Sequence, residues 1–553
     1  MDLATTAIVT ARIEKAGHGD RPRWHDSRII QKMRKSAGEL CRTPPGYVTA
    51  AFVCSLGGFI FGIDTGIIGP VTVMSDFKHY VGNPSPTVHG VIVSSILIPA
   101  AVSSCFAGRL ADALGRSRAI VIGSLIFALG AALEAGSVHI AMFILGRVVE
   151  GVGEGLYFGT LIAYICEISP PRYRGALTTA PQLLTTIGIV TGFFTCYGTV
   201  EIPTSLSWRL PFALLAVYAF IFAAVVFAWL PPSPRWLSLQ GRVDEAERAW
   251  EKLGVAHADR EKIMNQMDAS VGAPEAAPTE RGTRRAPPTT GRDKLLDVFS
   301  PDARMRFLMA VFLMGMQQLS GIDGVLYYAP LLFQQAGINT DQSTFLASGV
   351  SAIVIFGVTI PATIYADQWG RRISTILGGL AMTATMFLMG GLYAGGAVEG
   401  AGRWVVIVCI YLFSVLYCIS WAVSIKLYAA EIQPQRTRAS ATSIAHGSNW
   451  ITNFLVALFT PSLLANSSYG AYFLFGACTL FTALVCCVFM PETRGKSLDE
   501  IDQAFHGRSP QAALKRLVGK LKGGPSGRVG PILEGQNTSD SSGAIGSKAQ
   551  QVA

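Results

Sequence analysis

Two charged residues lie inside long apolar runs of the sequence. Asp64 falls within Ala51–Pro70, and Arg147 falls within Ile140–Ala163. A carboxylate near the middle of a membrane span costs about 2.5–3.5 kcal/mol on insertion scales, so such a group normally faces a partner or a watery cavity. We therefore expect Asp64 and Arg147 to form an ion pair that binds and releases protons. The alternative is an ion pair with a purely structural role.

The elements that would position this pair are membrane-spanning helices. About 20 apolar residues cross ~30 Å of hydrocarbon. We place twelve such spans, at 49–69, 90–108, 119–138, 140–163, 178–199, 210–230, 306–332, 345–366, 374–395, 404–425, 440–463 and 471–490. Half of the 553 residues are hydrophobic and 15% are charged, whereas soluble proteins carry about 25% charged residues. The sequence predicts an all-α membrane protein with twelve transmembrane helices.

The spans fall into two groups of six, which predicts two six-helix bundles. We expect a cytoplasmic amino-terminal segment 1–48, a first bundle 49–230, a cytoplasmic central loop 231–304, a second bundle 305–490 and a cytoplasmic carboxyl-terminal tail 491–553. The central loop shows a helical pattern over 243–267 and is then rich in Pro, Thr and Arg. That composition favours disorder in the later part of the loop.

The formal net charge of +9 is compatible with a nucleic-acid partner, but its distribution indicates a membrane orientation instead. Lys and Arg gather in the amino-terminal segment and in every second short loop, whereas the intervening loops 70–89 and 464–470 hold almost none. Cytoplasmic loops carry such an excess, so both termini are expected in the cytoplasm. We exclude nucleic-acid binding and expect the plasma membrane, because no organelle address is evident.

The sequence does not support enzyme, metal or cofactor chemistry. Most of the ten cysteines lie within spans, where Cys behaves as a small hydrophobe, and their spacing matches no metal motif. No nucleophile with a placed base and no phosphate-binding loop is recognisable. We expect a protein that is not an enzyme, binds no metal or cofactor, and is driven by a proton gradient. Asn466 begins a glycosylation sequon in a short outer loop, and its occupancy stays open.

Two charged motifs occur once in each half, at equivalent places on the inferred cytoplasmic face. Asp112-Ala-Leu-Gly-Arg and Asp367-Gln-Trp-Gly-Arg follow the second and eighth spans; Glu167-Ile-Ser-Pro and Glu431-Ile-Gln-Pro follow the fourth and tenth. The repetition predicts a duplicated architecture. It favours a cytoplasmic latch, which holds one conformation through charge-assisted bonds, over a simple solvated loop. The expected latch residues are Gly108, Arg109, Asp112, Arg116, Glu167, Arg174, Asp367, Arg371, Glu431 and Arg438.

In the order and spacing of its motifs, the chain resembles the sugar porter branch of the major facilitator superfamily over roughly residues 48–505. The motifs are Gly62-Ile-Asp-Thr-Gly66, Gly108–Arg118, Gly146-Arg147, Glu167–Gly175, Pro231–Leu237, Gln317–Gly321, Tyr327–Pro330 and Pro491–Gly495. The resemblance implies two six-helix bundles around a midplane substrate site that opens alternately to each side of the membrane.

The resemblance also implies roles for individual residues. In proton-coupled members an Asp on the first helix pairs with an Arg on the fourth, and Asp64 and Arg147 match those positions. Amides suit sugar hydroxyls because they offer donors and acceptors, and an aromatic face packs against ring C–H groups. The positions that contact sugar are matched by Gln182, Gln317, Gln318, Asn449 and Trp450, and the outer gate by Tyr327 and Tyr328.

The departures from the family pattern bear on the substrate. Asp323 replaces the usual Asn on the seventh helix, and Lys426 replaces a Trp or similar residue on the tenth. A lysine at cavity depth is costly unless it meets an anion. We hypothesise that Lys426 binds the carboxylate of a hexuronate such as galacturonate while Asp323 bonds a ring hydroxyl. The alternative is an Asp323–Lys426 pair in a neutral-sugar transporter. Further departures are Glu150, Glu154, Ile189 and Pro232.

The function expected from the sequence is proton-coupled symport of a monosaccharide or sugar acid by alternating access. The alternatives are symport of a neutral hexose or polyol, export of a sugar-like metabolite by proton antiport, and a sugar sensor that signals through its tails. A short tail of low complexity disfavours the sensor. The expected partners are the sugar, protons and the lipid bilayer, and a monomer is expected because one pair of bundles is enough for alternating access.

Overall fold

The structure is a computed structural model that describes residues 45–170, 172–257, 259–261, 263, 297–338, 340–365, 370–434, 438–494 and 505. The described residues form α-helices, one 3-10 helix (Asp297–Phe299) and connecting loops, and contain no β-strand. The predictions for the amino-terminal segment up to residue 44, for residues 264–296, for Asp367 and for the tail after Phe505 lie outside the described residues.

The first bundle contains six spans, the second of which is built from two consecutive helices. Ser85 caps this span, because its Oγ accepts a hydrogen bond from the Val88 N–H at 3.4 Å and the following proline occupies the first turn, where no N–H partner is needed. A short helix, α4 (Ser75–Val81), follows the first span. The spans are α3 (Gly46–Val73), α5 (Pro86–Ser94) with α6 (Leu97–Leu114), α7 (Arg116–Ala135), α8 (Ile140–Ile168), α9 (Arg174–Thr199) and α10 (Leu206–Trp229).

The second bundle contains two interrupted spans where the sequence predicts continuous ones. The span predicted over 306–332 is divided into three helices, and its first break ends at Gly321, whose φ of +86° favours glycine. The span predicted over 404–425 breaks at Ser420 and continues to Glu431. The helices are α15 (Pro301–Gln318), α16 (Ile322–Tyr327), α17 (Ala329–Gln335), α18 (Asp341–Tyr365), α19 (Arg371–Ala394), α20 (Ala401–Ile419), α21 (Trp421–Glu431), α22 (Arg438–Asn466) and α23 (Gly470–Phe489).

The prediction of an all-α protein with twelve membrane helices in two bundles is confirmed. Within the described ranges, eleven helical spans are long and apolar enough to cross a membrane. The twelfth is α22, which is 29 residues long and more polar. It packs against α15 in its own bundle and against α5 in the other.

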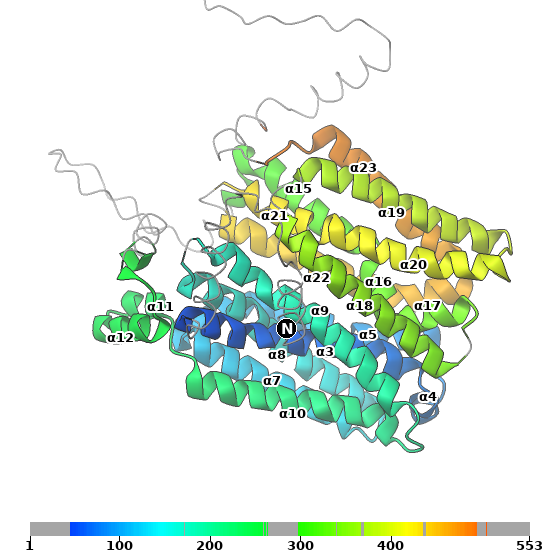
Figure 1. The fold of residues 1–553 in the computed structure, drawn as a ribbon, viewed down its shortest axis with the longest axis horizontal. Helices are drawn as coiled ribbons and strands as arrows, with labels where there is room; N and C mark the ends of the chain where they lie inside the picture. Colours follow the sequence, from blue (N-terminus) through cyan, green and yellow to red (C-terminus); the bar gives the residue numbers. More distant parts are fainter. Residues whose placement is uncertain are drawn as a thin grey trace, which may run out of the picture.

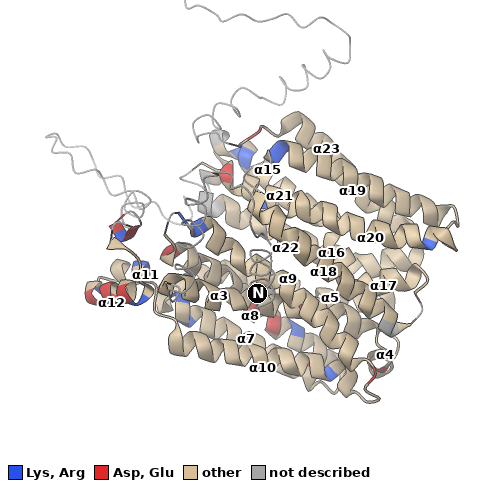
Figure 2. Ribbon diagram, viewed as in Figure 1, with Lys and Arg blue, Asp and Glu red and all other residues tan. Residues whose placement is uncertain are grey.

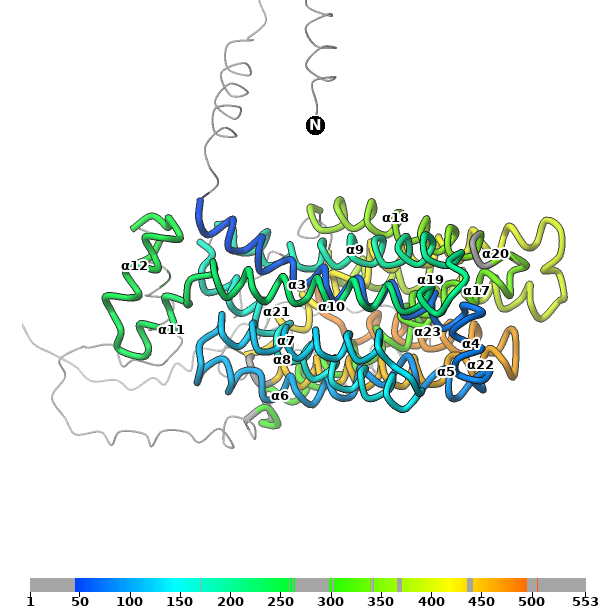
Figure 3. Tube along the Cα trace, turned by 90° about the horizontal axis from the view of Figure 1, so that it is seen from below, coloured from blue at the N-terminus to red at the C-terminus, as the bar shows by residue number. Residues whose placement is uncertain are grey.

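The two ends of the molecule differ in charge. Between the bundles the chain forms the short helices α11 (Pro234–Leu239) and α12 (Val243–Leu253), which project at one end, whereas α4 lies at the opposite end (Figures 1 and 3). The helix predicted over 243–267 is interrupted after Leu253, and helical residues resume at His257. Figure 2 shows the charged residues concentrated at the end that carries α12, with few along the helix bodies. We refer to these ends as the α12 end and the α4 end.

Glycines bring α3 and α9 of the first bundle into close contact. A Cβ on Gly62 would overlap the Thr185 carbonyl oxygen, and a Cβ on Gly188 would overlap the Phe59 carbonyl oxygen. Backbones approach this closely only where small residues face each other, as is common between membrane helices. The close contact holds α3 firmly against α9 at the level of Asp64.

Helices of the two bundles come into close contact toward the α4 end. A Cβ on Gly90 of α5 would overlap the Leu458 carbonyl oxygen of α22, and a Cβ on Gly69 of α3 would overlap the Tyr327 carbonyl oxygen of α16. Near the same end, a Cβ on Gly349 of α18 would lie 3.0 Å from the ring of Phe194 on α9. The α4 end is therefore closed between the bundles.

The contact between α3 and α9 predicts that two alanine substitutions on α9 differ in their effect on stability. Gly188→Ala places a methyl group against the Phe59 carbonyl, and such overpacking costs about 1–3 kcal/mol. Gly198→Ala adds the same methyl group to α9 in open space, where alanine favours the helix. We expect a lower melting temperature of the purified protein for the first variant and no loss for the second. Equal melting temperatures would contradict the close packing.

Candidate functional site

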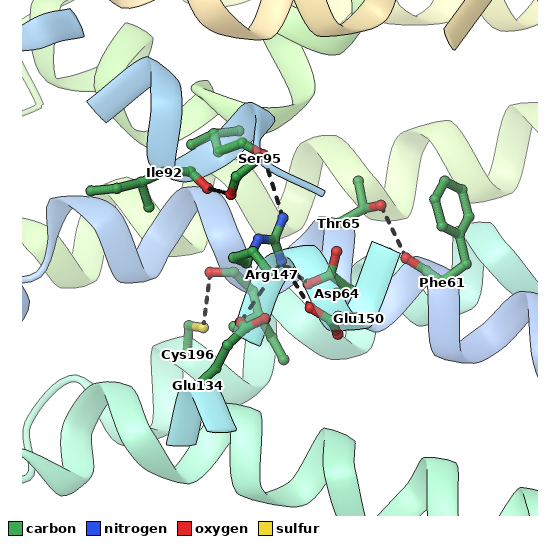
Figure 4. A network of polar contacts seen from close by, with 11 residues as sticks. Phe61, Asp64, Thr65, Ile92, Ser95, Glu134, Arg147, Glu150 and Cys196 are labelled. Atoms are coloured by element: carbon green, nitrogen blue, oxygen red, sulfur yellow. Dashed lines mark hydrogen bonds and ion pairs between the residues drawn. The ribbon is translucent and has the colours of Figure 1, made fainter. Parts of the chain in front are cut away.

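Arg147 lies at the centre of a buried charge cluster in the first bundle (Figure 4). Its Nη1 is 2.5 Å from Oδ1 of Asp64 on α3, 3.3 Å from Oε2 of Glu150 on α8 and 3.9 Å from Oε2 of Glu134 on α7. The side chains of Arg147 and Asp64 are 1% and 5% exposed, and both glutamates are fully buried. Its Nη2 donates to the Val93 carbonyl at 3.4 Å. Three helices thus direct carboxylates at one guanidinium.

The cluster contains the two residues that the sequence predicted and one that it missed. Asp64 and Arg147 are in direct contact, as expected. Glu134 was not among the expected site residues, although an acid inside the span predicted over 119–138 carries the same signal as Asp64. Glycine makes room for it, because a Cβ on Gly146 would lie 2.7 Å from the Glu134 Cγ.

A second polar group lies in the other bundle and consists mainly of amides. Gln317 donates to the Trp421 carbonyl at 2.9 Å, and Gln318 donates to the Asn449 Oδ1 at 3.2 Å. The Asn449 amide donates to the Met314 carbonyl at 2.8 Å and to the Gln317 Oε1 at 3.4 Å. These bonds join α15, α21 and α22, so the structure brings together three of the residues predicted to contact sugar.

Asp323 and Lys426 lie near this amide group. The Asp323 carboxylate interacts electrostatically with Lys426 and with the Gln318 amide, and Lys426 also interacts with His446 on α22. Among the described residues, Asp323 and Lys426 form no ion pair within 4 Å. Lys426 and His446 are both exposed although they lie on membrane helices. Neither side chain is therefore covered by the packing of the helices.

The remaining predicted contact and gate residues occupy different places. Gln182 is exposed on α9, apart from the amide group. Trp450 is half-buried and packs against the core of the first bundle, although it belongs to α22. Tyr327 and Tyr328 are buried in that core too, and the Tyr328 hydroxyl donates to the Ala457 carbonyl at 2.6 Å. The His89 ring meets Tyr328 edge-on at 5.2 Å between centroids. The tyrosines thus contribute to the closed α4 end.

In the first bundle, an ion-pair network at the α12 end joins the latch motifs. Arg116 lies 2.8 Å from Asp112 and 3.0 Å from Glu167. Glu167 also accepts a hydrogen bond from Ser233, and the Trp236 indole donates to the Asp112 carbonyl at 2.8 Å. The turn itself is made by glycine 115, whose φ is +92°. Gly108 and Arg109 are exposed. Three helices and the chain after α10 are tied together here.

The second bundle repeats this network at the same end. Arg371 lies 3.1 Å from Glu431, and Thr493 donates to Glu431 at 2.7 Å. Glu492 accepts hydrogen bonds from the backbone N–H groups of Arg371 at 2.8 Å and Arg372 at 3.1 Å, which places a carboxylate at the amino terminus of α19. The side chain of Arg438 and the whole of Asp367 lie outside the described residues, and Arg174 is half-buried.

The ion pairs of the described residues at the α12 end join elements of the same half of the chain. Ser233 and Glu492, which complete the two networks, were not among the predicted latch residues. Both belong to motifs on which the family resemblance rests, Pro231–Leu237 and Pro491–Gly495. The sequence therefore indicated that these segments matter, but it did not predict which residues they contact. The described residues include no group of three or more His, Cys, Asp or Glu side chains arranged to hold a metal ion.

Comparison with known families and curated proteins gives concordant matches. A family model described as sugar (and other) transporter matches residues 50–505. The glucose transporter GlcP of Staphylococcus epidermidis is 31% identical over 457 residues, which cover 82% of this chain and 96% of the relative. Hexose transporter 2 of Kluyveromyces lactis is 30% identical over 497 residues, which cover 84% of each chain.

The fold is also that of solved transporter structures. The inward-open conformation of the xylose transporter XylE from E. coli aligns with a TM-score of 0.68 at 23% identity, over 83% of this chain and 99% of XylE. The structure of XylE described as a proton:xylose symporter bound to 6-bromo-6-deoxy-D-glucose aligns with a TM-score of 0.67 at 24% identity, over the same shares. The match establishes the two-bundle fold of the major facilitator superfamily.

The network around Arg116 predicts a difference between two arginines on α7. Arg116→Gln removes the cation from Asp112 and Glu167, and leaving a mostly buried Glu167 without it costs about 1–3 kcal/mol. Arg118→Gln neutralises an exposed arginine one half-turn away. We expect thermal unfolding of the purified protein to shift to lower temperature for the first variant only. A similar shift for both would assign the effect to net charge.

Proposed function

This chain belongs to the sugar (and other) transporter family, and we propose that it imports a neutral hexose together with a proton. It is an integral membrane protein with many spans and is not an enzyme. The observation that carries the proton coupling is the buried contact between Asp64 and Arg147, 2.5 Å long. A neutral hexose is favoured because the relatives at 30–31% identity are named as hexose and glucose transporters.

We assign the conformation of this structure to the inward-facing state of the proposed transport cycle. The bundles are closed at the α4 end, whereas Gln182, Lys426 and His446 are exposed. With the α12 end in the cytoplasm, the proposal places these exposed groups on the route by which sugar leaves to the cell interior. The transporter then sits in the plasma membrane as a monomer with both termini in the cytoplasm, and it needs no cofactor.

The sugar is proposed to bind between the amide group of the second bundle and the facing helices of the first. Gln317, Gln318 and Asn449 are already ordered by mutual hydrogen bonds, so little side-chain entropy is lost when they meet hydroxyls. Gln318 Oε1 is buried without a hydrogen bond to the described residues, and a sugar hydroxyl that reaches it in the cycle would supply the missing donor. Trp450 offers an aromatic face to the ring carbons.

Proton binding at Asp64 changes the partner of Arg147 in the proposed cycle. A protonated Asp64 no longer holds the guanidinium, so Arg147 shifts toward its other carboxylates. This shift changes the contact between α3 and α8, and the conformational equilibrium moves with it. Sugar biases the same equilibrium from the second bundle, which couples the two ligands by linkage.

A sugar acid is a second candidate substrate because of Lys426. The side chain is exposed and makes no ion pair within 4 Å with the described residues, so its charge is available to a carboxylate. In the neutral-hexose proposal the electrostatic partner of Lys426 is Asp323. Proton-driven export of a sugar-like metabolite uses the same Asp64 and Arg147 and differs only in direction.

Asp64→Asn is predicted to abolish proton-driven transport and to spare exchange. In proteoliposomes, wild-type uptake of glucose should rise as the external pH falls, because more Asp64 is protonated on that side. The asparagine variant should show no accumulation above empty vesicles and no pH dependence, while counterflow of labelled glucose persists. Asp244→Asn, at an exposed position of α12, is the control. Retained accumulation by the Asp64 variant would exclude this residue as the coupling site.

Lys426→Met is predicted to separate the two substrate classes. We expect uptake of labelled glucose and not of galacturonate in transporter-deficient cells, and a reduced affinity for glucose in the methionine variant, because Asp323 loses its electrostatic partner. Lys426→Arg, which keeps the charge, is the control. Galacturonate uptake that disappears in the methionine variant while glucose uptake persists would favour the sugar acid. Uptake of neither sugar would favour the exporter.

A further inference from the structure

The cluster around Arg147 holds more acid than its single cation can balance. Asp64, Glu134 and Glu150 all lie within 4 Å of the Arg147 Nη1, and each is at most 5% exposed. If every group were ionised, the site would carry a net charge of −2 out of contact with water. Burying uncompensated charge costs several kcal/mol for each ion. The site is neutral only when two of the three carboxyl groups carry protons.

The contacts indicate which groups those are. Asp64 makes the shortest contact with the guanidinium, 2.5 Å, as an ionised carboxylate does. Glu150 and Glu134 lie farther from the same Arg147 Nη1, at 3.3 and 3.9 Å. The ionised group is the carboxylate closest to the guanidinium, so the two protons that neutrality requires fall to Glu134 and Glu150.

Both glutamates point into a site built to hold them. Neither oxygen of Glu134, and only one of Glu150, has a hydrogen-bond donor among the described side chains and backbone groups. Figure 4 shows both carboxyl groups turned toward Arg147. The helices leave room for them, since a Cβ on Gly130 would overlap the Glu150 backbone and a Cβ on Gly146 would crowd Glu134. Unpartnered, fully buried carboxyl oxygens therefore mark a binding site for a proton.

Other titratable or charged groups face the pair from the helices around it. Glu154 lies one turn further along α8 and is 1% exposed. Arg209 of α10 reaches the carboxyl end of α7, where Glu134 lies. Its guanidinium donates to the backbone carbonyls of Ala135 at 3.0 Å and Ser137 at 2.7 Å, and it forms no ion pair with Glu134 among the described contacts. Further electrostatic interactions around the pair come from three places. They involve Asp64 of α3, Arg147, Glu154 and Tyr157 of α8, Tyr327 of α16, and Tyr328, which follows α16. Arg147 is therefore the cation that contacts the pair.

We propose that Glu134 and Glu150 form a second proton-binding site, which exchanges a proton with Asp64 across Arg147. In one state Asp64 is ionised against Arg147 and both glutamates are protonated. In the other, an O–H bond of the glutamate pair has broken, an O–H bond at Asp64 has formed, and Arg147 balances the new carboxylate. The cluster keeps the same number of protons and the same net charge. Arg147 thus always has a counter-charge, which the Asp64–Arg147 pair alone does not provide.

The proposal deepens the proposed proton coupling, and infrared spectroscopy tests it without any transport. Protonated carboxyl groups give a C=O stretching band that ionised ones lack and that shifts between H₂O and D₂O. At neutral pH, Glu134→Gln and Glu150→Gln should each remove intensity from this band in the purified protein. Asp64→Asn should remove intensity as well, because a glutamate must then ionise to balance Arg147. Glu245→Gln, at an exposed residue paired with Arg242, should leave the band unchanged.

A band that neither glutamine variant changes would overturn the proposal. The two substitutions probe one pair from two helices, so either variant that folds is sufficient. In proteoliposomes, the glutamine variants should slow proton-driven glucose accumulation by about 100-fold, the lower range for loss of a positioned proton donor, while counterflow persists. Equal loss of accumulation and counterflow would show a structural role instead. If the wild type transports glucose without protons, the proposed function fails, yet the infrared result still decides whether the pair holds protons.

Discussion

A guanidinium inside a helix bundle must have counter-charges within a few ångströms, and much of the first bundle follows from this requirement. Arg147 is 1% exposed, so water cannot replace a missing partner. Its carboxylates come from α3, α7 and α8, and these helices must approach closely enough for short side chains to reach it. Glycines between α7 and α8 and between α3 and α9 permit that approach. Close packing and charge pairing thus depend on each other.

The polar centre of the second bundle is built from amides instead of a buried cation and its carboxylates. These amides bond one another and the backbone, and neutral groups of this kind are less costly to bury than ions. Breaks at Gly321 and Ser420 interrupt two spans of this bundle beside this centre. Non-helical backbone at membrane depth occurs where it lines a cavity or is covered by protein. In the proposed cycle, the first bundle handles protons and the second handles sugar.

The two ends of the molecule are held by different contacts. At the α4 end, helices of opposite bundles meet through backbone and aromatic contacts around Tyr327 and Tyr328. At the α12 end, the ion pairs centred on Arg116 and Arg371 stiffen each bundle separately. In the proposed cycle, each bundle moves as a unit about the contacts of the α4 end. Bistable interfaces between stiff units are the usual basis of large conformational changes.

The sequence by itself determined the helical membrane fold, its division into two bundles and the residues Asp64 and Arg147, because apolar run length and misplaced charge are local signals. It also marked Glu150, Lys426 and the latch motifs as unusual or repeated. Only the tertiary structure placed Glu134 beside Arg147, joined Gln317, Gln318 and Asn449, and left Asp323 and Lys426 without a direct ion pair. These outcomes depend on how helices rotate and approach, which side-chain packing between distant segments decides and no local pattern encodes.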